Sequence, residues 1–159
     1  MSMTILCVGR LRERFYRDAA NEYLKRLQRF GAHAEIEIPD LPEPANPSAA
    51  QEVEVCRREG ERLLATIQPG DWVVALCVTG KATTSEALAA RIADWEVQGK
   101  RRIVWVIGGS LGLSDAVVQR ADVRLSLSAM TFPHQLARVV LLEQLYRARK
   151  INAHERYHK

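Results

Sequence analysis

Two short runs of apolar residues place the strongest constraint on how this chain can fold. They are WVVALCV, at Trp72–Val78, and RIVWVIGG, at Arg102–Gly109. A strand that is apolar on both of its sides must be covered on both faces, which is typical of a parallel sheet flanked by helices. Three further short runs fit the same sheet, and the second and third of them show the alternation of half-buried strands: Met3–Val8, Ala34–Ile38 and Val123–Leu127.

Helix-like segments separate these runs, because their apolar residues recur every three or four positions. The first, Arg14–Phe30, is expected to stop at Gly31, and the last spans about His134 to Lys150. This alternation predicts an α/β fold with a mostly parallel sheet and helices on both faces. At 159 residues the chain has the size of one domain, which we place at residues 1–159.

Capping signals predict where the middle helices begin. Ser48 and Gln51 have the spacing of a capping box, and so do Thr83 and Glu86. Ser114 is expected to cap a short fourth helix. The buried stripe predicted for the helix after Ser48 comprises Val53, Cys56, Gly60, Leu63 and Ile67.

The last helix carries more apolar surface than one contact needs. A single stripe of about 100° is enough to pack a helix on a sheet. The surplus predicts a second surface, and in so short a chain we expect that surface to be another subunit, which gives a homodimer. The apolar residues are Leu136, Val139, Val140, Leu141, Leu142, Leu145 and Tyr146.

Composition excludes several classes of protein. Apolar residues make up 47% and charged residues 26%, which is ordinary for a soluble globular protein and excludes a disordered chain. No apolar stretch approaches the roughly 18 to 20 residues that cross a bilayer, and the N-terminus lacks the pattern of a signal peptide. We therefore expect a cytoplasmic protein without a membrane partner. Cys7, Cys56 and Cys77 lack metal-site spacing, so we expect reduced, buried thiols and no metal.

The net charge of +4 is a mild excess with an uneven distribution. Basic residues dominate from Arg138 to the end of the chain. Such a basic end attracts phosphate, although a solvated helix face has the same pattern. The tail also carries His154, Tyr157 and His158, which suit stacking on unpaired RNA bases but equally fit a frayed terminus.

The stretch VIGGSLGLS, at Val106–Ser114, is a candidate ligand loop. It follows a strand and precedes a helix, which places it at the carboxyl ends of the strands, where α/β proteins bind ligands. Its spacing, G-G-x-x-G, matches neither the dinucleotide fingerprint nor the P-loop, so an ATP or GTP site is disfavoured. On local grounds a structural turn and a ligand loop remain equally good interpretations.

The stretch SAMTFPHQLARVV, which begins at Ser128, is the second candidate. Ser128 and Thr131 offer hydroxyl groups, and His134 lies in the first turn of the last helix, where a polar residue is ordinary. No nucleophile, base and orienting acid have a recognisable spacing, so the sequence does not support a hydrolase triad.

Together these segments resemble a known family over nearly the whole chain. IGGSLGLS, then LSLSAMTFPHQLARVVLLEQLYRARKI, then a terminal YHK look like the ribosomal RNA large subunit methyltransferase H family of the SPOUT superfamily. The resemblance implies a homodimer that transfers a methyl group from S-adenosylmethionine to N3 of a pseudouridine in a 23S rRNA stem-loop, on the assembled ribosome. It also implies a deep trefoil knot in the C-terminal part of the fold, a feature that is otherwise nearly absent from proteins.

The resemblance further implies which residues bind the cofactor. Three loops hold the adenine mainly through backbone groups and apolar walls, and the cofactor has no phosphate, which explains the missing phosphate motif. The cofactor-binding residues expected from the matched motifs are Leu76, Gly108, Leu127, Ser128, Ala129, Met130, Thr131 and Phe132.

We hypothesise that the C-terminal tail, residues 151–159, contributes to catalysis together with the last helix. Tyr157 or His158 is expected to lie nearest the base, where the N3 proton must leave, and Arg147 is expected to bind a phosphate or the base carbonyl. The tail is expected to serve the partner's site across the dimer. Two alternatives stay open: a non-catalytic ribosome- or RNA-binding module, and a different small nucleotide-binding α/β protein.

Overall fold

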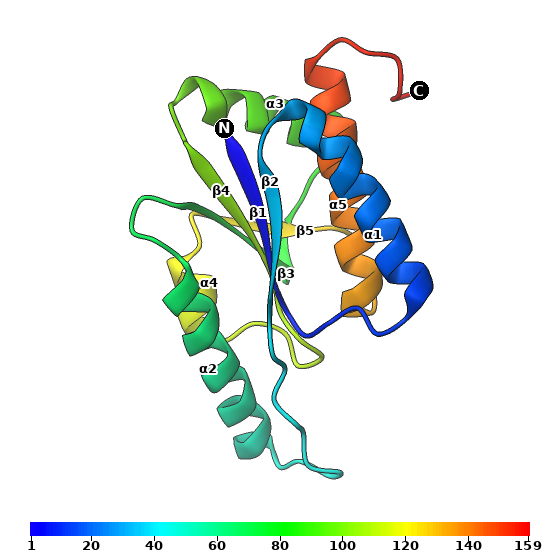
Figure 1. Ribbon diagram of the computed structural model, residues 1–159. Helices are drawn as coiled ribbons and strands as arrows, with labels where there is room; N and C mark the ends of the chain where they lie inside the picture. Colours follow the sequence, from blue (N-terminus) through cyan, green and yellow to red (C-terminus); the bar gives the residue numbers. More distant parts are fainter.

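The computed structural model describes residues 1–159 and contains a five-stranded, all-parallel sheet in the order β2-β1-β4-β3-β5. β4 lies between β1 and β3 although it comes later in the chain, so the connections cross the sheet (Figure 1). The predicted parallel α/β sheet is therefore confirmed. The strands are β1 (Ser2–Val8), β2 (His33–Ile38), β3 (Trp72–Ala82), β4 (Arg102–Ile107) and β5 (Val123–Ser126).

Helices cover both faces of the sheet, as predicted. α1, α3 and α5 pack on one face, where they share a core cluster with every second strand residue, and α2 and α4 pack on the other (Figure 1). The helices are α1 (Arg14–Leu27), α2 (Ala49–Thr66), α3 (Ser85–Val97), α4 (Asp115–Arg120) and α5 (His134–Asn152), with a 3₁₀ turn at Gln28–Phe30.

Strand β4 lies in the middle of the sheet, and this position explains why its own sequence is one apolar run. Ile103 and Trp105 belong to the core under α1, α3 and α5, whereas Val104 and Val106 belong to the core under α2 and α4. All four side chains are fully buried. Successive residues of a strand point to opposite faces, so a strand buried on both faces needs apolar residues at every position.

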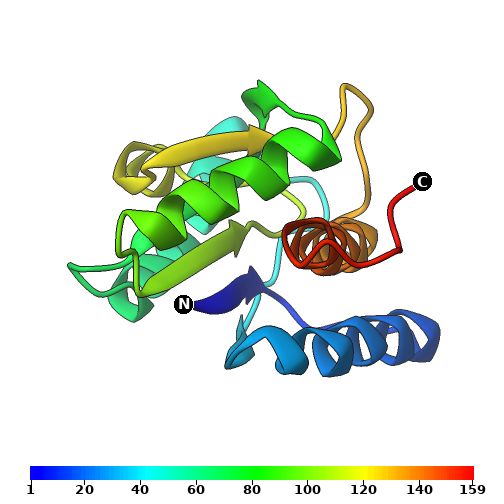
Figure 2. The same ribbon diagram turned by 90° about the horizontal axis from the view of Figure 1, so that it is seen from above.

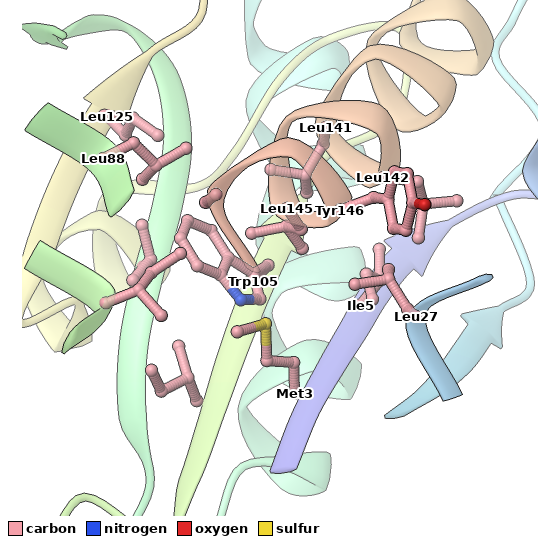
Figure 3. Close-up of a cluster of buried hydrophobic side chains, with 14 of the residues drawn as sticks. Met3, Ile5, Leu27, Leu88, Trp105, Leu125, Leu141, Leu142, Leu145 and Tyr146 are labelled. Carbon is pink, nitrogen blue, oxygen red and sulfur yellow. The ribbon is translucent and has the colours of Figure 1, made fainter. Parts of the chain in front are cut away.

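α5 lies between α1 and α3, which changes the interpretation of its apolar surplus (Figure 2). Leu141, Leu142, Leu145 and Tyr146 are buried against Trp105 and its neighbours within the same chain (Figure 3). The sequence argument for a second subunit was therefore wrong for most of this surface. Leu136 and Val140 are the members that remain partly exposed and outside the core clusters.

Two buried arginines fix α5 at its two ends. Near its start, Arg138 donates to Glu35 Oε1 at 2.8 Å and to the Gly9 carbonyl at 2.7 Å, and it also bonds Glu37. Near its end, Arg149 donates to Glu96 Oε2 at 2.8 Å and to the Phe30 carbonyl at 3.0 Å. Buried charges need such partners, so these contacts define where α5 sits against β1, β2 and α3.

The helix boundaries confirm two predicted caps and correct a third. Ser48 and Gln51 form both hydrogen bonds of the capping box. The third helix, however, is capped by Thr84, whose hydroxyl accepts from Ala87 N, so the pairing of Thr83 with Glu86 was wrong. Ser114 caps α4 as predicted.

The predicted stripe of α2 and the predicted burial of the cysteines are only partly correct. Leu63 and Gly60 are buried, but Val53 is 67% exposed, because it lies before the part of α2 that reaches the sheet. Cys7 is buried, whereas Cys56 and Cys77 are half-buried.

β3 continues beyond the predicted end of its apolar run. Leu76 and Lys81 both lie opposite Leu125 of β5, so the residues between them form an excursion out of the strand. A Cβ added at Gly80 would lie 2.4 Å from the backbone of Leu125. This excursion therefore packs directly onto β5, which is one wall of the candidate site.

Candidate cofactor cavity and C-terminal tail

A cavity of about 440 Å³ lies at the carboxyl ends of the strands. Its walls come from the end of β3, the loop after β4 and the loop before α5, which are the three segments expected from the sequence. Ala129 is exposed and does not line the cavity. The expected residues that line it are Leu76, Gly108, Leu127, Ser128, Met130, Thr131 and Phe132.

The glycine loop is a tight turn that closes on itself. The Gly112 N–H donates to the Gly109 carbonyl at 3.1 Å, and Gly112 has φ +84°, a conformation that favours glycine. A Cβ at Gly108 would lie 2.4 Å from the Gly112 carbonyl oxygen. The closure of the loop therefore explains why residue 108 is glycine, and Gly108 also lines the cavity.

The loop before α5 is shaped by its own hydroxyl groups. Ser126 Oγ donates to the Ser128 carbonyl at 2.9 Å, and Ser128 Oγ accepts from Met130 N at 3.0 Å. The Met130 side chain is 73% exposed at the rim of the cavity, and so is that of Val78, at 79%. The mouth of the cavity therefore presents apolar side chains to its surroundings.

The three predicted catalytic residues form one cluster beside the second half of α5 and the first turn of α3. Arg147 Nη1 lies 3.3 Å from His158 Nδ1, and its guanidinium stacks 4.8 Å from the centre of the Tyr157 ring. Glu143 accepts from Tyr157 Oη at 3.2 Å and also bonds Arg147. His158 Nε2 lies 2.7 Å from Glu86 Oε1. The tail thus folds back on the helices.

Both ring nitrogens of His158 have partners in this arrangement. A carboxylate only accepts and a guanidinium only donates, so Nε2–H donates to Glu86 and Nδ1 accepts from Arg147. Burial, followed by the charge of Glu143, raises the pKa of Tyr157 to about 12. Tyr157 therefore stays protonated at neutral pH and can donate a hydrogen bond.

The tail cluster lies far from the cavity of its own chain. His134, at the first turn of α5, lines the cavity, and none of Arg147, Tyr157 and His158 does. About 20 Å of helix separates His134 from Arg147, at a rise of about 1.5 Å per residue. One chain therefore does not bring the expected cofactor site and the expected catalytic residues together.

Neither a metal centre nor a membrane segment is visible in the structure. No three His, Cys, Asp or Glu side chains are grouped so that they could hold a metal ion. No helix combines the length and apolarity that a bilayer crossing requires.

Comparisons with known proteins identify the family. A family model described as a predicted SPOUT methyltransferase matches residues 1–158. The chain is 52% identical to the ribosomal RNA large subunit methyltransferase H of Bifidobacterium animalis subsp. lactis (strain AD011), with 100% of both chains covered. It is 49% identical to the protein of that name from Clostridium novyi (strain NT), again over 100% of both. The chain belongs to the ribosomal RNA large subunit methyltransferase H family of SPOUT methyltransferases.

A solved structure shares the fold of this chain. The crystal structure of a probable methyltransferase from Bordetella pertussis Tohama I superposes with a TM-score of 0.54, covering 92% of this chain and 95% of that one. At 15% identity, this likeness supports the fold alone.

The cavity of this methyltransferase H family member also contains polar residues that sequence reasoning did not select. Thr79, Asp115, Ser126 and His134 line it. Burial, followed by the charge of Arg138, lowers the pKa of His134, which favours its neutral form. Asp115 directly follows the Ser114 cap at the same edge of the sheet, and this position could have identified it from the sequence as a candidate site residue.

Proposed function

We propose that this protein is an S-adenosylmethionine-dependent methyltransferase that modifies N3 of a pseudouridine in a 23S rRNA stem-loop, on the assembled ribosome in the cytoplasm. Its relatives carry the name ribosomal RNA large subunit methyltransferase H. The observation that carries the proposal is the cavity of about 440 Å³ walled by the three expected segments.

The lining of the cavity fits a nucleoside that has no phosphate. Ile107, Leu113 and Val118 add to the apolar walls, while hydroxyls and the Asp115 carboxylate offer hydrogen bonds. Pockets of this kind bind small ligands through apolar contact and a few placed polar groups. When bound, the cofactor supplies an activated methyl group on a sulfonium.

The tail residues would position the acceptor and move its proton. Tyr157, with its raised pKa, donates a hydrogen bond. His158 accepts a proton only after it releases Arg147, because the Nδ1 lone pair is occupied in this arrangement. Once Arg147 is released from His158, its Nη1 can bind a phosphate or the base carbonyl, while its Nη2 stays paired with Glu143. Substrate binding would therefore rearrange this cluster before the proton moves.

We also propose that the active unit is a homodimer in which the tail of one chain serves the cavity of the other. The separation of tail and cavity within one chain supports this arrangement. An apolar surface is available near the cavity: Leu136 and Val140 on α5 are partly exposed, and Val78 and Met130 are exposed at the rim. A self-complementary patch of this kind suits a two-fold interface.

The deep trefoil knot is likewise a proposal for the C-terminal part of the chain. Its support is the path of the loop Leu127–Pro133, which leaves the edge strand β5 and reaches α5 between α1 and α3. The β3 excursion and the glycine loop line the same cavity as this segment. A crystal structure traced through these three loops tests the threading.

Calorimetry separates the proposal from its rivals. Titration with S-adenosylmethionine and S-adenosylhomocysteine should show binding, and titration with ATP should show none. Binding of ATP alone would favour a different nucleotide-binding protein, and no binding of any of the three would favour a non-catalytic RNA-binding module. Mass spectrometry of 23S rRNA from cells lacking the protein should then reveal one pseudouridine without its N3 methyl group.

Complementation tests the exchange of tails. Ala137 lines the cavity, so Ala137→Phe is expected to block cofactor binding, while His158→Ala leaves the cavity intact. A refolded equimolar mixture should recover about a quarter of the wild-type activity, since half of the dimers are mixed and each has one complete site. Recovery of no activity, with mixed dimers present, would show that each tail serves its own chain.

A further inference from the structure

The segment between β1 and α1 forms a basic, aromatic corner. We define the arginine corner as Arg10, Arg12, Arg14 and Arg17 together with the adjacent rings of Phe15 and Tyr16. All four arginines are exposed, Phe15 is 63% exposed, and the two ring centres are 4.5 Å apart. Phe15 lies outside both core clusters, whereas Tyr16 packs against the core, so the Phe15 ring is the one that is available to a ligand.

Local acids neutralise the arginine corner only in part. Arg12 pairs with Asp40 at 3.0 Å and Arg14 pairs with Asp18 at 3.5 Å, through side chains that are half or more exposed. Arg10 forms no ion pair. The N-cap residue of α1 is Glu13, which makes no capping hydrogen bond, and the first turn of α1 contains no acidic residue.

The arginine corner continues into the cofactor cavity. A second cavity of about 300 Å³ is lined by Arg10 and Arg12 and by Asp40, Glu43 and the buried Glu59. It shares Gly109, Ser110 and His134 with the first. In Figure 1 the corner lies at the lower end of α1, beside the start of α5. A chain lying along the corner would therefore reach the cofactor.

The arginine corner is also held in a fixed position. Arg12 N donates to Gln135 Oε1 at 2.8 Å, and Arg138 donates to the Gly9 carbonyl at 2.7 Å. Both partners belong to the first turns of α5, as does the cavity residue His134. The basic surface and the cavity are thus parts of one preformed site, which favours binding because little ordering is required.

We propose that the arginine corner binds single-stranded RNA next to the acceptor nucleotide, with the arginines on backbone phosphates and Phe15 under an unpaired base. This inference rests on the proposed function and adds the surface that holds the substrate. Guanidinium groups match phosphate geometry, and aromatic faces stack unpaired bases in single-stranded RNA. Arginines and an aromatic ring also suit a protein partner, but the continuity of the corner with the cofactor cavity favours the RNA substrate.

The first test neutralises two arginines in the arginine corner and, as a control, two arginines elsewhere on the surface. Arg10→Gln/Arg14→Gln is compared with Arg58→Gln/Arg101→Gln, whose side chains are exposed and form no ion pair. Binding of a fluorescent single-stranded RNA with the target-loop sequence is followed by anisotropy across a salt series. The corner variant should bind about tenfold more weakly, with the slope of log K against log salt smaller by about 1.4. Equal slopes in the two variants would overturn the proposal.

Kinetics on unmethylated ribosomes separates this proposal from the proposed function. The corner variant should raise KM for ribosomes about tenfold and leave kcat and cofactor affinity unchanged. If the wild-type protein neither binds the cofactor nor transfers a methyl group, the proposed function fails. If ribosome binding falls while binding of the RNA oligonucleotide does not, the corner docks on a protein and the RNA proposal is wrong.

A second variant tests the ring without changing charge. Phe15→Ala should weaken RNA binding about five- to tenfold, because base stacking is lost. Val97→Ala, at the 88% exposed end of α3, is the matched control for an exposed apolar side chain and should bind as the wild type does. Unchanged binding in Phe15→Ala would remove the aromatic pair from the site.

Discussion

The sites at the two ends of α5 are formed by different kinds of chemical group. At its start, the cavity is made of backbone turns, apolar walls and hydroxyl groups. At its end, Arg147, Glu143 and Tyr157 form a charged cluster with His158. Shape and backbone suit the binding of a nucleoside, and charged side chains suit proton movement. Because the two sites are separate, substitutions should affect cofactor affinity and turnover independently.

The arginines that anchor these two ends also differ. Arg138 is 1% exposed and faces Glu35 and Glu37, which are 15% and 35% exposed. Arg149 is 9% exposed, but its partner Glu96 is 44% exposed. A carboxylate that is already near water is cheaply solvated when its partner is lost. The stability of the protein should therefore depend more strongly on Arg138, at the cavity end of α5, than on Arg149.

Removing the first anchor should have the largest effect. Arg138→Met leaves Glu35 and Glu37 without their buried partner and the Gly9 carbonyl without its donor, so the free energy of unfolding should fall by about 3–5 kcal/mol. Urea denaturation measures this change. Arg57→Met, which removes an exposed arginine paired with Glu54 and Glu61, is the control and should cost less than about 1 kcal/mol. Similar losses in both variants would contradict the difference between buried and exposed pairs.

Substitutions in the tail should separate turnover from cofactor binding. His158→Ala is expected to lower kcat at saturating cofactor about 100-fold, the typical contribution of a proton-transfer group, and Tyr157→Phe should lower it less. Arg147→Ala should weaken the use of RNA. Calorimetry should find the cofactor affinity of all three unchanged, because none of them lines the cavity. Unchanged turnover in both His158→Ala and Tyr157→Phe would exclude the tail from the chemistry, and weaker cofactor binding in Arg147→Ala would exclude its RNA role.

The fold was more predictable than the site. The apolar runs around Val74 and Trp105 identified strands covered on both faces, since two-sided burial leaves no other pattern. The three cavity segments were found because the family resemblance supplied them. Their meeting at one edge follows from parallel strand order, which local sequence does not encode.

The failures have physical causes in tertiary packing. The surplus apolar face of α5 was assigned to a second subunit, but α1 and α3 cover most of it, and a periodicity does not say what covers a helix. Thr83 and Thr84 are both good caps, and only the backbone geometry selects Thr84. The closure of Gly108 on Gly112 and the arginine corner likewise depend on contacts that form only in the folded chain.

Acid should lower the free energy of unfolding through one buried histidine, His33. His33 accepts from Met3 N through Nδ1, and burial, followed by the charges of Arg149 and the N-terminus, lowers its pKa from 6.5 to about 4. Between these values the unfolded chain binds more protons than the folded chain, so stability falls as pH drops through this window. The expected loss is about 2 kcal/mol at pH 5 relative to pH 8. Urea denaturation at several pH values measures it.

A matched pair of variants isolates the contribution of His33. His33→Asn keeps an acceptor for Met3 N but cannot titrate, so its stability should vary less between pH 8 and pH 5. His154→Asn is the control, because His154 is exposed and has φ +54°, a conformation that asparagine tolerates. If both variants keep the acid dependence of the wild type, groups other than His33 are responsible.

Removing the second anchor should have the smallest effect on stability and a specific effect on pH dependence. Arg149→Met leaves the Phe30 carbonyl without its donor, while the exposed Glu96 is solvated, so the expected loss is about 1 kcal/mol. Because Arg149 is one cause of the lowered pKa of His33, its removal should raise that pKa and reduce the loss of stability between pH 8 and pH 5. A loss as large as that of Arg138→Met, with unchanged acid dependence, would show that partner exposure does not distinguish the two ends of α5.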